Sequence, residues 1–379
     1  MPQDSHETHL SMDHSDLKGY LASVRRRARG LWPHIFDDLA PELREAMAEV
    51  GYHVPCPVHG GVDGFRLFPD FQDTGGGFCN TCKGKGDGIR MLAWLRGINL
   101  EQAAQKIEEY LGQCDGKPRK KLELPKPKHR EVDFESNLRY IKQLSAEAIP
   151  IKGTPVETYL IKRGIYPENI SRQLRAHPRL NYVFRDGSKT QTWGMLATLR
   201  DPAGRVVAMH RTYITEDGDK ASFVCPVRGR KLSAKKLTGI AGPLEGAAIR
   251  LFEADSSPVL GFAEGIETAH AAYAISRVPC WATYSAQLME QVVIPDHVRH
   301  VVIWQDKDVS GRGAEAASAL MRRLTKLKRT WEVCIPPGDI PSGEKGIDWL
   351  DVLVTKGIEG FPLRWRNWTP TATPSIATA

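Results

Sequence analysis

The chain has 379 residues, more than one hydrophobic core usually supports, so the sequence predicts two or three domains. Lysine and arginine outnumber aspartate and glutamate by 52 to 45, and this net charge of +7 favours a polyanionic partner. No apolar run is long enough to span a bilayer, and the first residues do not resemble a signal peptide. We therefore expect a cytoplasmic protein that makes no membrane contact.

Residues 1–50 are expected to form a polar tail followed by short helices. The tail includes His6, His9 and His14 but shows no apolar periodicity. From about residue 17 to Val50, apolar side chains recur at loosely helical spacing, which indicates helices that pack on the segment that follows.

Residues 51–115 predict a compact zinc-binding module. Its ligands form two pairs, each spaced by two residues: Cys56 with His59, and Cys79 with Cys82. This spacing suits a tetrahedral site with three cysteines and one histidine, and four protein ligands leave no open position for catalysis. We therefore expect one structural zinc ion, with His53 as the main rival for the histidine position.

The same module predicts two short strands, at residues 64–69 and 77–79, and then two helices, the second capped by Asn99 with Gln102. Aromatic and basic side chains lie between the ligand pairs, where core packing and stacking on bases are both open. These residues are Phe65, Arg66, Phe68 and Phe71.

Residues 116–133 are rich in lysine, arginine and proline, which predicts an extended basic linker. Residues 134–250 indicate a mixed region of helices and strands, with a hairpin that turns between Asp201 and Arg205. Residues 251–355 alternate strand and helix patterns, which predicts a mainly parallel sheet covered by helices. Residues 356–379 are expected to form a tail.

Acidic residues follow two apolar, strand-like runs of the 251–355 region. Glu264 ends the first run, Asp306 and Asp308 follow the second, and Asp348 and Asp351 come later in the chain. The carboxyl ends of parallel strands meet at one edge of a sheet, so these oxygens predict a site for Mg²⁺ or Mn²⁺ and chemistry on phosphates. Glu267, by contrast, is expected on a solvated face.

Together these motifs resemble the bacterial, phage and plasmid DNA primases, in which a zinc-binding module precedes a Toprim catalytic domain. The resemblance rests on Cys56-Pro-Val-His59, Cys79-Asn-Thr-Cys82, Phe262-Ala-Glu264-Gly-Ile-Glu, Gln305-Asp306-Lys-Asp308 and the late acids in Gly-Ile-Asp348-Trp-Leu-Asp351. It implies a multidomain α+β fold with a small zinc ribbon, a mixed α/β middle region and an α/β Toprim domain.

The resemblance also implies roles for individual residues. Glu264 would serve as a general acid or base or would organise metal, and Asp306 and Asp308 would hold Mg²⁺ or Mn²⁺. Asp348 or Asp351 would supply a further acid, and Asp348 is placed with the catalytic set. Basic residues of the middle region would bind nucleotide or DNA: Arg211, Lys235 and Lys236.

The implied activity is synthesis of short RNA primers on single-stranded DNA from ribonucleoside triphosphates, in the replication of a chromosome, phage or mobile element. No Gly-x-x-x-x-Gly-Lys-Ser/Thr pattern occurs, so a replicative helicase would be met in trans. A Toprim nuclease and a non-catalytic zinc-containing DNA-binding protein of replication or recombination remain alternatives. A topoisomerase would need further domains, for which the chain is too short.

Overall fold

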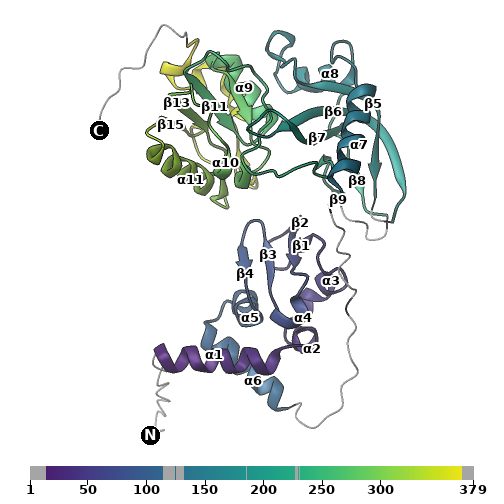
Figure 1. Cartoon of the computed structure of the whole chain (residues 1–379), viewed down its shortest axis with the longest axis vertical. Coiled ribbons are helices and arrows are strands. Elements are labelled where there is room, and N and C mark those ends of the chain that lie inside the picture. The colour runs from purple at the N-terminus through teal and green to yellow at the C-terminus, as the bar shows by residue number, and fades with distance from the viewer. Residues whose placement is uncertain are drawn as a thin grey trace. The chain divides into compact units, whose positions relative to one another are not determined.

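The computed structural model describes residues 14–113, 124, 132–184, 186–226, 229 and 231–368. The chain divides after residue 130 into two compact units, and each is described by itself (Figure 1). The expected polar tail before residue 14, nearly all of the basic linker and the last residues of the chain lie outside the described part. Within that part, no helix combines the length and the apolar character needed to cross a membrane.

The first unit surrounds a small antiparallel sheet with helices. The sheet has the order β1-β2-β3-β4, formed by β1 (Val54–Cys56), β2 (Gly60–Leu67), β3 (Gly77–Cys79) and β4 (Lys83–Lys85). The helices are α1 (His14–Ala28), α2 (Trp32–Leu39), α3 (Arg44–Met47), α4 (Phe71–Thr74), α5 (Gly88–Arg96) and α6 (Leu100–Gly112), with a 3-10 turn at Pro41–Leu43.

One hydrophobic core joins these helices to the sheet. Phe65 and Phe71 are fully buried in it together with Trp32, so both phenylalanines pack in the core and are not exposed for stacking on bases. A Cβ atom at Gly88 would lie 2.2 Å from the Trp32 ring, so this helix start requires glycine. Helix α6 begins with the expected capping box, in which Gln102 N donates to Asn99 Oδ1 at 2.8 Å.

The middle region of the second unit is built on an antiparallel sheet with the order β10-β7-β6-β5. Its strands are β5 (Arg175–Val183), β6 (Lys189–Arg200), β7 (Val206–Ile214) and β10 (Lys235–Leu237), beside a small pair of β8 (Phe223–Val224) and β9 (Lys231–Leu232). Helices α7 (Phe134–Glu147) and α8 (Pro155–Lys162) and a 3-10 turn at Pro167–Asn169 accompany them. The hairpin between β6 and β7 turns where predicted, because Asp201 Oδ1 accepts the Arg205 backbone N–H at 2.9 Å.

The remaining part of the second unit is an α/β region with a parallel sheet in the order β12-β11-β13-β15. The strands are β11 (Val259–Ala263), β12 (Cys280–Ala282), β13 (His300–Trp304) and β15 (Thr330–Cys334). The helices are α9 (Ile266–Ser276), α10 (Ala286–Gln291), α11 (Arg312–Lys326) and α12 (Trp349–Lys356), and β14 (Lys307–Asp308) pairs with β16 (Gly346–Ile347). The parallel, helix-covered sheet expected from the sequence is confirmed.

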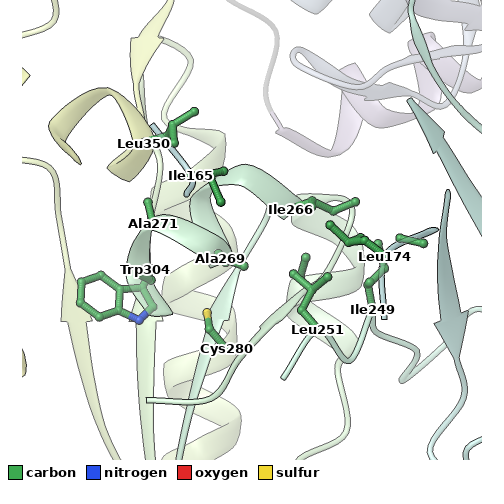
Figure 2. Close-up of a cluster of buried hydrophobic side chains, with 14 of the residues drawn as sticks. Ile165, Leu174, Ile249, Leu251, Ile266, Ala269, Ala271, Cys280, Trp304 and Leu350 are labelled. Carbon is green, nitrogen blue, oxygen red and sulfur yellow. The ribbon is translucent and has the colours of Figure 1, made fainter. Parts of the chain in front are cut away.

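Successive residues of β13 face opposite sides of this sheet, as strand geometry requires. Val301 and Ile303 pack in one core with α10 and α11, whereas Val302 and Trp304 pack in another with α9 and α12. The second core continues into the middle region: Figure 2 shows Ile165, Leu174 and Ile249 from that region in the same cluster as Ala269, Cys280 and Trp304.

The stretch after residue 356 is packed through Trp368, which corrects the expected tail. It forms 3-10 turns at Gly357–Gly360 and Leu363–Trp365. The Phe361 ring lies 4.8 Å from that of Trp349, and the Trp365 ring stacks on His300 at 5.6 Å between centroids. Three aromatic side chains anchor this segment: Phe361, Trp365 and Trp368. The expectation of a tail relied on the last ten residues of the chain, whose composition says nothing of these aromatic residues.

Candidate functional site

The four expected zinc ligands lie together in the first unit. The ligand atoms of Cys56, His59, Cys79 and Cys82 all lie within 4.8 Å of one another, and His59 Nε2 is 3.2 Å from Cys79 Sγ. Cys56 and Cys79 end strands β1 and β3, and the other two ligands lie in the turns that follow. Among the described residues, this group has these four members and His53 lies outside it.

The chemistry of this donor set fits a bound cation. Burial raises the pKa of the Cys82 thiol to about 12, and the charges of Cys79 and Cys56 add to that rise. Thiolates this close repel one another, and a divalent ion is what makes their joint deprotonation favourable. Four protein ligands would close such a site, which suits a structural rather than a catalytic ion.

In the second unit, the acids that follow β11 and β13 meet at one edge of the parallel sheet. The two strands are neighbours, with Ala263 in register with Trp304, so Glu264 and Asp306 emerge beside each other. Thr268, in the first turn of α9, directs its hydroxyl toward Asp306 Oδ1 at 3.5 Å. These are two of the acids expected at this edge.

The acids at this edge oppose one another's ionisation. Burial raises the pKa of Asp306 well above its usual range, and the charges of Glu264, Asp348 and Asp308 raise it further. Burial also raises the pKa of Glu264, with the charge of Asp308 as the next cause. A cluster of half-buried carboxylates that resist losing their protons is suited to divalent cations, which relieve the repulsion.

Asp308 differs from its neighbours because hydrogen bonds hold it as an anion. Its carboxylate accepts the Gly313 backbone N–H at 2.8 Å, the Arg312 backbone N–H at 3.2 Å and the Ser310 hydroxyl. Although burial opposes ionisation, these bonds lower the pKa of Asp308. A Cβ atom at Gly313 would lie 2.5 Å from the backbone oxygen of Asp306, so glycine is needed for helix α11 to begin this close to the acids.

Asp348 reaches the same edge from a distant part of the chain. Strand β16 pairs with β14, with Gly346 opposite Asp308, and this pairing carries the following residues toward the acids. Asp348 also caps helix α12 by accepting the Leu350 N–H at 2.8 Å and the Asp351 N–H at 3.0 Å. The charge of Asp348 acts on Asp306, whereas Asp351 is exposed and its charge acts on Asp348.

The three expected basic residues lie in different surroundings. The charge of Lys235 acts on the acids, because it partly offsets the rise in the pKa of both Glu264 and Asp306. Arg211 donates to the backbone oxygen of Leu237 at 2.6 Å, and the Lys236 ammonium lies 3.6 Å from the centre of the Tyr182 ring.

Arg312 is a further cation at this edge that the sequence did not single out. Its charge acts on Glu264, and its guanidinium pairs with Glu290. Its position directly after Gly311, at the start of the helix that follows the acids, is the sequence feature that could have identified it.

Glu267 is not on a solvated face, which corrects the expectation for this residue. It is 4% exposed in the first turn of α9, where its carboxylate accepts the Tyr159 hydroxyl at 2.9 Å and the Lys235 ammonium at 3.0 Å. The error has a physical source: α9 is buried among both regions of the second unit, so it has little solvated face for a charged residue to occupy.

Three family models match successive parts of the chain. Residues 51–89 match the zinc-binding domain of primase-helicase, residues 135–251 match a domain of unknown function, DUF7146, and residues 259–359 match the Toprim domain. These matches confirm the zinc-binding and Toprim domains that the sequence motifs indicated, in the expected order.

Solved structures with distant similarity include three primase fragments. The Aquifex aeolicus primase, with its zinc-binding and RNA polymerase domains, is 18% identical, with 90% of this chain and 83% of that chain covered and a TM-score of 0.37. The primase fragment of the bacteriophage T7 primase-helicase is 17% identical, with 81% and 95% covered and a TM-score of 0.35. The DnaG primase catalytic domain bound to single-stranded DNA is 15% identical, with 60% and 78% covered and a TM-score of 0.40.

Proposed function

We propose that this chain, which joins a primase-type zinc-binding domain to a Toprim domain, is a DNA primase that makes short RNA primers on single-stranded DNA. The observation that carries the proposal is the convergence of acids from three separate segments at one sheet edge. Glu264, Asp306, Asp308 and Asp348 act on one another electrostatically there, and a closed zinc ribbon lies in the same chain.

The four carboxylates are suited to hold Mg²⁺ or Mn²⁺. When bound, such ions polarise phosphate oxygens and stabilise the charge that develops as a 3′-hydroxyl displaces pyrophosphate from a nucleoside triphosphate. Asp308, kept anionic by its hydrogen bonds, and Asp306 would supply ligand oxygens. Glu264, whose pKa is raised by burial, is suited to accept the proton of the attacking hydroxyl.

Basic residues of the middle region and the zinc module supply the remaining contacts in this proposal. Lys235, Arg211 and Lys236 lie on strands β10 and β7 and would bind phosphates of nucleotide or template. The zinc module would engage the single-stranded template, and a replicative helicase would be the partner during replication.

The test is primer synthesis on unprimed single-stranded DNA with labelled ribonucleotides and Mg²⁺ or Mn²⁺. We expect the wild type to give short labelled products and Asp306→Ala to reduce their rate by a factor of about 100 or more, as losing a group that stabilises the transition state does. Asp339→Ala removes an exposed carboxylate of the same domain and is the matched control, with an expected rate near that of the wild type.

Two other outcomes would contradict the proposal. Metal-dependent cleavage of the DNA without primer synthesis would indicate a Toprim nuclease. DNA binding without either activity would indicate a non-catalytic protein of replication or recombination. Replacing ribonucleotides by deoxyribonucleotides in the same assay determines which kind of nucleotide is incorporated.

A further inference from the structure

An ion pair between the Toprim domain and the middle region lies beside the acid edge. Glu267, from the start of α9, and Lys235, from strand β10, meet with the lysine Nζ 3.0 Å from each carboxylate oxygen. The glutamate side chain is 5% exposed and that of the lysine 34% exposed. The carboxylate is therefore inside the protein, while its partner remains partly open to a ligand.

Tyr159 fixes the carboxylate from the other side. Its hydroxyl, on helix α8, donates to Glu267 Oε1 at 2.9 Å, and its ring is 2% exposed. Nearby His210 does not compete for the carboxylate as a cation, because burial, followed by the charge of Lys235, lowers the pKa of its imidazole to about 3. Lys235 is thus the cation in direct contact with the buried carboxylate of Glu267.

The backbone of Lys235 is also held in place. Strand β10 pairs with β7, with Lys235 opposite Thr212, and the Lys235 N–H donates to Ser233 Oγ at 3.1 Å. A lysine side chain is long and flexible, and it loses conformational freedom when it binds a phosphate. A partner that already holds the ammonium in the free protein reduces this loss.

We propose that Glu267, supported by Tyr159, is a positioning residue that holds the Lys235 ammonium for the phosphates of the incoming ribonucleoside triphosphate. The inference rests on the proposed primase function, gives a role to Glu267, the last residue of the Phe262-Ala-Glu264-Gly-Ile-Glu motif, and adds Tyr159, which lies outside the primase motifs. It follows from geometry: the buried carboxylate that holds Lys235 lies three residues beyond Glu264 and next in sequence to Thr268, whose hydroxyl is 3.5 Å from Asp306 Oδ1.

A purely structural ion pair is the competing explanation, since the pair also joins two regions of one unit. The two explanations differ in what they change. A structural pair affects the melting temperature alone, whereas a positioning residue affects the KM for the nucleotide in a protein that remains folded.

The experiment measures primer synthesis against ribonucleoside triphosphate concentration, with saturating single-stranded DNA and Mg²⁺, for the wild type, Glu267→Gln and Tyr159→Phe. We expect Glu267→Gln to raise the KM about tenfold, as when one positioned charge contact is weakened, with kcat changed much less. Tyr159→Phe keeps both charges and should raise the KM by a smaller factor. Glu359→Gln, which breaks the exposed pair with Arg366, is the matched control and should leave the KM unchanged.

A double variant tests whether Glu267 acts through Lys235. The double variant Glu267→Gln with Lys235→Gln should have the same KM as Lys235→Gln alone. Glu267 should therefore have no effect on the KM once the lysine charge is removed. A Glu267→Gln protein that folds and has a KM within twofold of the wild type overturns the inference. If circular dichroism shows that Glu267→Gln is unfolded, the Tyr159→Phe variant provides the test instead. An unchanged KM in Tyr159→Phe then overturns the inference.

The failure of the inference is separate from the failure of the proposed function. A wild-type protein that makes no primers contradicts the primase assignment itself. An active wild type whose Glu267 and Tyr159 variants keep the wild-type KM contradicts only the positioning role.

Discussion

The pKa values of three carboxylates in the Toprim domain are shifted in different directions because the groups around them differ. Backbone and hydroxyl donors lower the pKa of Asp308, and neighbouring acids, after burial, raise that of Asp306. Burial also opposes the ionisation of Glu267, yet the ammonium of Lys235 holds its pKa well below the usual range. At this scale, the surroundings of a carboxylate determine whether it is suited to bind a metal ion or to hold a lysine.

His270 provides a test of buried charge away from the acids. Its Nδ1 donates to the Ile266 backbone oxygen at 2.7 Å and its Nε2 accepts the Ser171 N–H at 3.1 Å, so the neutral ring satisfies both neighbours. Burial lowers the pKa of this imidazole to about 4. Protonation of Nε2 would place its N–H group against the backbone N–H of Ser171.

The predicted effect is on the free energy of unfolding. Below about pH 6.5 the unfolded chain binds a proton at His270, whereas the folded chain does not bind it until the pH falls to about 4. The contribution of the neutral His270 to the free energy of unfolding is therefore fully present above about pH 6.5 and is lost as the pH falls toward about 4. Between pH 7 and pH 5, urea unfolding should show the wild type losing about 2 kcal/mol more than His270→Gln. Parallel pH profiles for the two proteins would show that His270 is not protonated differently on unfolding.

At the scale of elements, the sequence predicted best where one face of an element is apolar or where a strand ends at an acid. The parallel sheet lies where strand and helix patterns alternate, and α6 has the predicted cap. Glu264 and Asp306 were found because parallel strands bring their carboxyl ends together. Glu267 was missed because α9 is buried on several sides, and its partners Tyr159 and Lys235 lie far away in sequence.

Asp348 has two roles in this proposal, capping helix α12 and contributing a charge to the acid edge. Asparagine is as good a cap as aspartate but carries no charge. We predict that Asp348→Asn keeps the melting temperature within about 2 °C, a change of well under 1 kcal/mol, while primer synthesis falls at least tenfold. Measured in parallel, Asp351→Asn should leave synthesis nearly unchanged, and the reverse order of losses would make Asp351 the functional acid.

At the scale of the whole molecule, the hydrophobic cores of the two units have no members in common among the residues that the structure describes. The core of the first unit draws on residues from Leu17 to Leu124, and the other cores draw on residues from Tyr140 to Trp368. Units with separate cores can unfold independently. The zinc ligands belong to the first of these cores, since Cys56 and Cys79 are buried within it.

We therefore predict two thermal transitions, only one of which responds to zinc. Structural zinc contributes on the order of 10 kcal/mol to the folding of small modules, so a zinc-selective chelator should abolish or greatly lower the first unit's transition. Differential scanning calorimetry at fixed Mg²⁺ makes the measurement, and Cys79→Ser should reproduce the effect without a chelator. A single transition that shifts as a whole would contradict the independence of the units.

The packed segment at residues 357–368 affects the order in which the protein can fold during translation. Phe361 and Trp365 cover Trp304, Trp349 and His300, which belong to or adjoin the central strand β13. A growing chain can complete the zinc module early, once α6 has emerged. The face of the parallel sheet that carries Trp304, however, lacks part of its cover until residues near Trp368 leave the ribosome. Until then, the unfinished second unit is therefore the part that needs protection from aggregation.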